Sequence, residues 1–134
     1  MTKVTYLSAA AAVTIGLMVA VSGPSLAHHS GAAYDRSKQT TVEGEVKEWR
    51  WSNPHAWLQI YVPGAEGDKM LWSFEATSPN ILLKQGFTRT GMKPGDKVMV
   101  TFFPLGDGGP GGSLIRVKKD DGTVMGMPEK KPSE

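Results

Sequence analysis

Cysteine is absent from the 134 residues of this sequence. Without cysteine the chain has no disulfide, no thiol chemistry and no cysteine for a lipid anchor, and its stability depends on a hydrophobic core alone. An excess of one charge is also lacking, because 15 Lys and Arg stand against 13 Asp and Glu, for a net charge of +2. This balance does not provide the strongly basic face that nucleic-acid binding requires, so we expect no nucleic acid among the partners.

Long hydrophobic runs are missing except near the N-terminus, where residues 1–27 are typical of a secretory signal peptide. Lys3 precedes an uncharged apolar stretch over residues 7–21, and the small residues Ser25 and Ala27 occupy the −3 and −1 positions of a cleavage site. We therefore expect cleavage after Ala27 and a periplasmic or secreted protein without a stable membrane anchor. The alternative is an uncleaved anchor, but a spanning helix needs about 20 apolar residues.

Five later segments alternate between apolar and polar residues, as half-buried strands do, and turns rich in Gly, Pro, Asn and Asp separate them. They are residues 40–51, 55–62, 70–76, 97–104 and 113–119. Between the third and the fourth segment, Ser78 is a predicted helix N-cap, Pro79 the first helical residue and Gly86 the stop.

Five strands with one short helix after the third is the element order of the OB-fold, a small and partly open Greek-key barrel. We therefore predict an all-β chain with an OB-fold-like barrel over residues 40–120. An extended N-terminal arm over residues 28–39 precedes it, and a flexible tail over residues 121–134 follows it.

Histidine is scarce, and two of the three histidines are adjacent. Cleavage after Ala27 makes His28 the N-terminal residue, so its α-amine, its imidazole and the next backbone nitrogen can chelate one ion. The amine and the imidazole both titrate near neutral pH, and nitrogen donors in tetragonal geometry suit Cu(II). His28, His29 and His55 are therefore the candidate ligands of a metal, with copper as the candidate cofactor. The alternative is a polar arm that binds metal adventitiously and a His55 that serves only the turn.

Two methionines and one carboxylate are further candidates near such a site. Met125 and Met127 carry thioethers, which are soft ligands that favour Cu(I), although methionine also fills gaps in cores. Glu75 is a candidate partner that orients the His55 imidazole. The alternative for Glu75 is a salt bridge to Arg89.

The tryptophans suggest a different class of function. Trp49 and Trp51 are predicted on the strand face opposite to Val42 and Val46, and Trp57 on a face opposite to its apolar neighbours. Exposed together, the three indoles would form a platform on which a small organic or saccharide ligand stacks. The alternative is that the helix, the arm or the tail covers them.

Catalysis has little support in the sequence, and we predict a protein that is not an enzyme. No order of Ser, His and Asp stands out, and the glycine-rich segment 105–112 lacks the lysine and the following helix of a phosphate loop. We expect this segment to be a flexible hairpin loop. A copper oxidant that uses His28 and His55 is the last-ranked hypothesis, because a chain this small has little flat surface for a polymeric substrate.

Four short motifs stand out along the chain, namely AHHS, NPHAW, SPN and KPGD. In this combination the sequence resembles a family of small exported bacterial proteins that is catalogued as a domain of unknown function. The resemblance covers essentially the whole chain after the signal peptide. It implies an exported OB-like barrel and no particular activity or protein partner.

Overall fold

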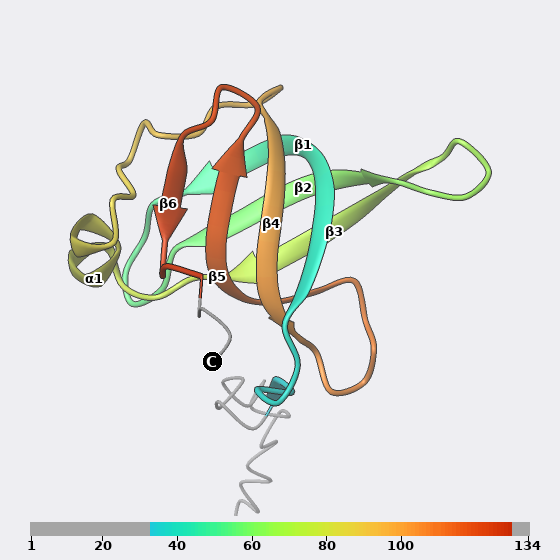
Figure 1. Ribbon diagram of the computed structural model, residues 1–134, viewed down its shortest axis with the longest axis horizontal. Coiled ribbons are helices and arrows are strands. Elements are labelled where there is room, and N and C mark those ends of the chain that lie inside the picture. Colours follow the sequence, from blue (N-terminus) through green and yellow to red (C-terminus); the bar gives the residue numbers. More distant parts are fainter. Residues whose placement is uncertain (1–32, 130–134) are drawn as a thin grey trace, which may run out of the picture.

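The computed structural model describes residues 33–129, which form a small β-barrel with one short helix (Figure 1). The arm and tail segments outside this range, with His28, His29 and the predicted signal peptide, lie outside the described residues. The elements are β1 (Thr40–Arg50), β2 (Trp57–Pro63), β3 (Lys69–Glu75), α1 (Pro79–Lys84), β4 (Lys97–Pro104), β5 (Gly111–Lys119) and β6 (Val124–Gly126).

The sheet has the strand order β3-β2-β1-β4-β5-β6, and all of these neighbours pair antiparallel. A parallel pairing of β3 with β5 closes the first five strands into a barrel. This confirms the predicted all-β fold, with its helix between the third and the fourth strand. The sixth strand, β6, was not predicted; it pairs with β5 inside the segment expected to be a flexible tail.

The core fills the barrel with the inward side chains that the alternation predicts. Its largest fully buried members are Phe74, Phe87, Phe102, Leu58, Ile60 and Leu82. Leu82 belongs to α1, which lies at one side of the barrel in Figure 1. Helix α1 begins at Pro79 as predicted, although the Ser78 side chain makes no capping hydrogen bond. No helix among residues 33–129 is long and apolar enough to cross a membrane.

A β-bulge in β1 reverses the predicted faces of the tryptophans. The register with β2 shifts between Val46 and Glu48, so Lys47 is the extra residue. After a bulge the alternation restarts with opposite phase. Val46 and Trp49 therefore both point inward, and Trp49 and Trp51 pack against the core cluster. The prediction that these two tryptophans lie opposite to Val46 was wrong, because a bulge leaves no trace in the apolar pattern.

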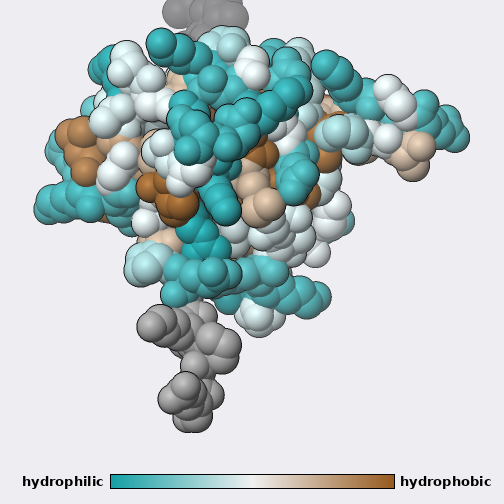
Figure 2. Space-filling model, turned by 45° about the horizontal axis from the view of Figure 1, so that its top comes forward, coloured by the Kyte–Doolittle hydropathy of each residue, from teal (hydrophilic) through white to brown (hydrophobic). Residues whose placement is uncertain are grey.

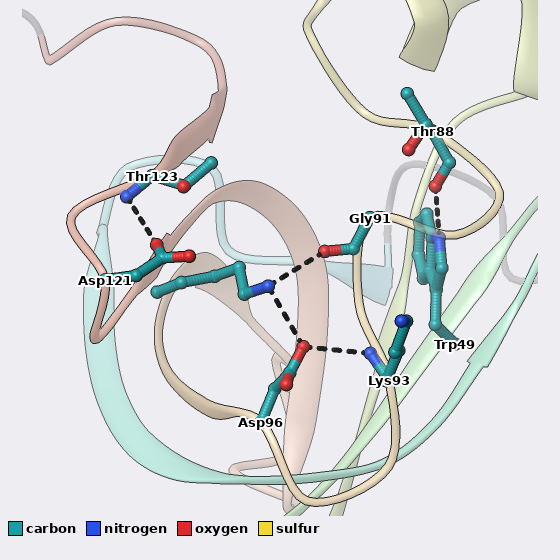
Figure 3. A network of polar contacts seen from close by, with 8 residues as sticks. Trp49, Thr88, Gly91, Lys93, Asp96, Asp121 and Thr123 are labelled. Carbon is teal, nitrogen blue, oxygen red and sulfur yellow. Dashed lines mark hydrogen bonds and ion pairs between the residues drawn. The ribbon is translucent and has the colours of Figure 1, made fainter.

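The KPGD motif forms a turn that docks on this bulge. The Gly95 N–H donates to the Val46 carbonyl, and the Val46 N–H donates to the Asp96 carbonyl, each over 2.8 Å. The Asp96 carboxylate accepts the Lys93 N–H at 2.9 Å and pairs with Lys119 at 3.1 Å (Figure 3). The motif thus has a structural role that explains its residues, because it pairs with the Val46 backbone groups just beyond Glu45 and Lys97, where the β1–β4 pairing ends.

We expect Asp96→Asn to lower the free energy of unfolding by about 1 kcal/mol at neutral pH. The Lys93 N–H, and secondarily Lys119, hold the pKa of Asp96 below its usual value. A lowered folded-state pKa gives stability that is present above the unfolded pKa of about 3.9 and is lost as the pH falls through the folded value. The difference between wild type and variant, measured by urea unfolding, should therefore shrink below about pH 4. An equal difference at neutral and acid pH would contradict this role.

The glycine-rich segment is only partly the flexible hairpin that we predicted. Strand β5 begins at Gly111, two residues earlier than expected, and both Gly111 and Gly112 are buried. Gly111 pairs with Ser73 and Gly112 with Phe74 in the contact that closes the barrel.

Figure 2 shows one face of the molecule as mostly hydrophilic, with small hydrophobic areas and the β2–β3 hairpin projecting to one side.

Candidate metal site

His55 lies in the loop between β1 and β2, and hydrogen bonds hold the backbone on both sides of it. Its carbonyl accepts the Ser52 hydroxyl at 2.8 Å. The next residue, Ala56, is fully buried, donates to the Thr77 carbonyl at 3.2 Å and accepts the Ala76 N–H at 2.9 Å. The loop therefore presents His55 beside the C-terminal end of β3, and about half of its side chain, 49%, remains exposed.

Glu75, the last residue of β3, binds two side chains with its two carboxylate oxygens. Oε1 contacts His55 Nδ1, and Oε2 accepts the hydroxyl of Tyr34. The Glu75 side chain is only 12% exposed. Because an ionised carboxylate only accepts hydrogen bonds, His55 Nδ1 carries the proton in this contact. In the neutral imidazole, the lone pair is then on Nε2, which is the arrangement of a metal-binding histidine oriented by a carboxylate.

Tyr34 fastens the end of the N-terminal arm to the barrel beside His55. It forms a bridge with Leu105, and the neighbouring Asp35 N–H donates to the Pro104 carbonyl at 2.8 Å. Burial, followed by the hydrogen bond to Glu75, raises the pKa of Tyr34 far above its usual value. The phenol is therefore protonated at neutral pH and donates to Glu75.

These three side chains line one cavity of about 310 Å³. Its wall comes from the arm, the β1–β2 loop, the ends of β3 and β4 and the first half of β5, together with residues after α1 and β6. In OB-folds the ligand site lies at the face of the second and third strands, near the first and last strand-connecting loops. The other residues that line the cavity of this protein are Arg36, Ala76, Thr77, Gln85, Phe103, Ser113, Leu114, Ile115 and Met127.

The predicted ligands can be compared with the structure only at His55. Among residues 33–129, no three His, Cys, Asp or Glu side chains gather in a group that could hold a metal ion. His28 and His29 lie outside the described residues, so the predicted ligand set remains a prediction. Glu75 does contact His55, and within the described chain it has no ion pair with Arg89, the alternative partner.

The tryptophans of the alternative ligand platform have structural partners. Trp49 stacks edge-on against Trp51 and packs against Phe87, with ring centroids 5.7 Å apart in both cases. Its Nε1 donates to the Thr88 carbonyl at 2.9 Å (Figure 3). Trp57 is half-buried and is the cross-strand neighbour of Glu75. Binding of an organic or saccharide ligand to these rings stays a prediction.

The two C-terminal methionines differ in their surroundings. Met125 is 4% exposed and belongs to the core. Met127, two residues further on, is 44% exposed and lines the cavity that also contains His55. The packing role that the sequence left open for both methionines thus applies to Met125, and Met127 contributes its thioether to the cavity wall.

The comparison with known families places the chain by its sequence. Residues 14–114 match a family described as "Family of unknown function (DUF6152)". The chain belongs to the DUF6152 family. This confirms the resemblance to a family without a known activity. No curated protein and no solved structure matches the chain. Membership in DUF6152 supplies no reaction and no ligand, so the function has to be argued from the cavity around His55.

Sequence reasoning missed Tyr34 and Arg36 at this cavity. Both belong to an arm without apolar periodicity, so no pattern predicted that these residues pack on the barrel. The only available signal was Tyr34 itself, a large aromatic residue among small and polar neighbours.

Proposed function

We propose that this DUF6152 protein is a non-enzymatic metal-binding module of the periplasm or the cell exterior, and that copper is its metal. His28, His29 and His55 are the proposed ligands. The observation that carries the proposal is the contact between His55 Nδ1 and Glu75, because it leaves Nε2 as a free donor at the wall of the cavity. A histidine that only served the turn would not need a buried carboxylate on its ring.

The way in which the arm is fastened supports a site shared between the arm and the barrel. Tyr34 follows His28 by six residues and binds the same carboxylate as His55. Six residues span at most about 20 Å when extended, so the proposed N-terminus lies within reach of the cavity. Glu75 would thus orient one ligand directly and bring the other two near it through Tyr34.

The chemistry of the donors favours copper over other divalent ions. An α-amine, imidazoles and a backbone nitrogen form an all-nitrogen set, and Cu(II) heads the affinity order of the divalent first-row metals. We expect a metal ion as the partner, because the His55 imidazole, oriented by Glu75, lines this cavity of about 310 Å³. Export, predicted from residues 1–27, is required for this proposal, since only cleavage after Ala27 frees the His28 amine.

Cu(II) titration of the exported protein tests the proposal, with mass spectrometry to establish that His28 is its first residue. Loss of the His55 ligand in His55→Ala should weaken Cu(II) binding about tenfold, or 1.4 kcal/mol, and change the electron paramagnetic resonance spectrum. A free His-His-Ser peptide is the reference for a chelate without the barrel. If the protein binds Cu(II) no more tightly than this peptide, or if His55→Ala changes neither affinity nor spectrum, the proposal fails.

A further inference from the structure

Met127 and His55 open on the same cavity, although 72 positions separate them in the sequence. Met127 follows the short strand β6, which pairs with β5 and so carries the chain back to the cavity. The cavity wall therefore contains two kinds of donor. The Met127 thioether is a soft donor, and the free imidazole nitrogen of His55 is a borderline one. Soft thioether ligands select Cu(I) among the biological metals.

The backbone of Met127 is held in place by β5. Its N–H donates to the Ile115 carbonyl at 3.1 Å, and its carbonyl accepts the Arg116 guanidinium at 3.3 Å. Gly126 just before it has φ +110, and a Cβ there would lie 2.3 Å from the Ile115 carbonyl oxygen, so only glycine lets the chain approach β5 so closely. Met127 is therefore positioned by the fold, although its side chain is 44% exposed.

One cationic and one anionic side chain line the cavity. Arg36 lines it, and its guanidinium lies over the Phe103 ring, 5.4 Å from the centroid. The carboxylate of Glu75, which accepts the Tyr34 hydroxyl and contacts His55 Nδ1, provides the opposite charge. These opposite charges leave the preference between the two copper ions to the donor atoms, and the Met127 thioether is the donor that favours Cu(I).

We propose that Met127 is a ligand of Cu(I) and that the cavity between His55 and Met127 is a cuprous site. This inference rests on the proposed copper-binding function and extends it from the oxidised ion, which suits the nitrogen donors of the arm, to the reduced ion. The module would then hold copper in either oxidation state by exchanging arm nitrogens for the Met127 sulfur.

Competition with bicinchoninate under anaerobic, reducing conditions measures Cu(I) affinity in the full exported protein. Met127→Leu should lower it about tenfold or more, and Cu(II) affinity should change much less. Leucine is close to methionine in volume, so thermal unfolding should show a folded protein. Met99→Leu is the matched control, because Met99 is 38% exposed but lines a different groove.

X-ray absorption of the Cu(I)-loaded protein provides a second readout, which should show a sulfur neighbour in wild type and in Met99→Leu but none in Met127→Leu. If Met127→Leu keeps both the Cu(I) affinity and the sulfur signal, Met127 is no ligand and the inference is overturned. A wild-type protein that binds Cu(I) no better than the His-His-Ser peptide would also overturn it. Failure of the proposed function is read separately, from the Cu(II) titration of His55→Ala.

Discussion

Replacing Glu75 with glutamine is expected to weaken Cu(II) binding by about 10- to 100-fold, the range found when a partner that orients a metal ligand is removed. One carboxylate performs two tasks, since it fixes the His55 ring through Nδ1 and holds Tyr34 at the end of the arm. Glutamine keeps the size of the side chain but has one acceptor oxygen in place of two. The variant should therefore release one of these groups or let both move.

The measurement is a Cu(II) titration followed by tryptophan fluorescence, because Trp57 lies directly across from Glu75 on β2 and bound copper quenches nearby indoles. Glu66→Gln is the control, since Glu66 is an exposed carboxylate in the β2–β3 turn. Tyr34→Phe separates the two tasks of Glu75, because it releases the arm but leaves the contact with His55. If Glu75→Gln binds as tightly as Glu66→Gln, Glu75 has no part in metal binding.

Much of the barrel was predictable because half-buried strands alternate with period two. Strand β4 has the predicted bounds of residues 97–104, since its alternation is uninterrupted and a turn precedes it. The bulge at Val46 was not predictable, because one extra residue changes the face of every later side chain and leaves the composition unchanged. That single residue decides whether Trp49 forms part of a binding face or part of the core.

The candidate site was predictable only for residues that one hairpin joins. His55 and Glu75 flank the β2–β3 hairpin, so antiparallel pairing brings them together, and the sequence supports such a contact. Tyr34 and Met127 come from opposite ends of the described chain. Their position depends on backbone contacts with Leu105 and Ile115, and no periodic pattern encodes contacts of that kind.

The closure of the barrel depends on glycine at the start of β5, and we expect Gly111→Ala to lower the free energy of unfolding by about 3 kcal/mol or more. Gly111 has φ +146, which side chains rarely allow, and a Cβ there would lie 2.0 Å from the Ser73 carbonyl oxygen. That oxygen belongs to β3 at the point where β3 and β5 pair. Because the Cβ is attached directly to the β5 backbone and the oxygen belongs to the β3 backbone, the two strands must separate to admit a methyl group.

Gly106→Ala is the matched control within the same glycine-rich segment. A Cβ at Gly106 would meet only the Ala33 carbonyl, at an ordinary contact distance of 3.6 Å. Urea unfolding should leave this variant within about 0.5 kcal/mol of wild type. Equal stabilities of the two variants would contradict the closure role of Gly111.

Gly111→Ala also connects the fold to the site. Glu75 pairs with Ser113 in the same β3–β5 contact, two positions along from the pair of Ser73 and Gly111. If β3 moves away from β5 at Gly111, the Glu75 carboxylate moves relative to His55 and Tyr34, which belong to other segments. Under conditions in which Gly111→Ala is still folded, we therefore expect Cu(II) binding to weaken as it does in Glu75→Gln. Gly106→Ala should bind as wild type does. Full-strength binding by a folded Gly111→Ala protein would show that the site does not depend on barrel closure.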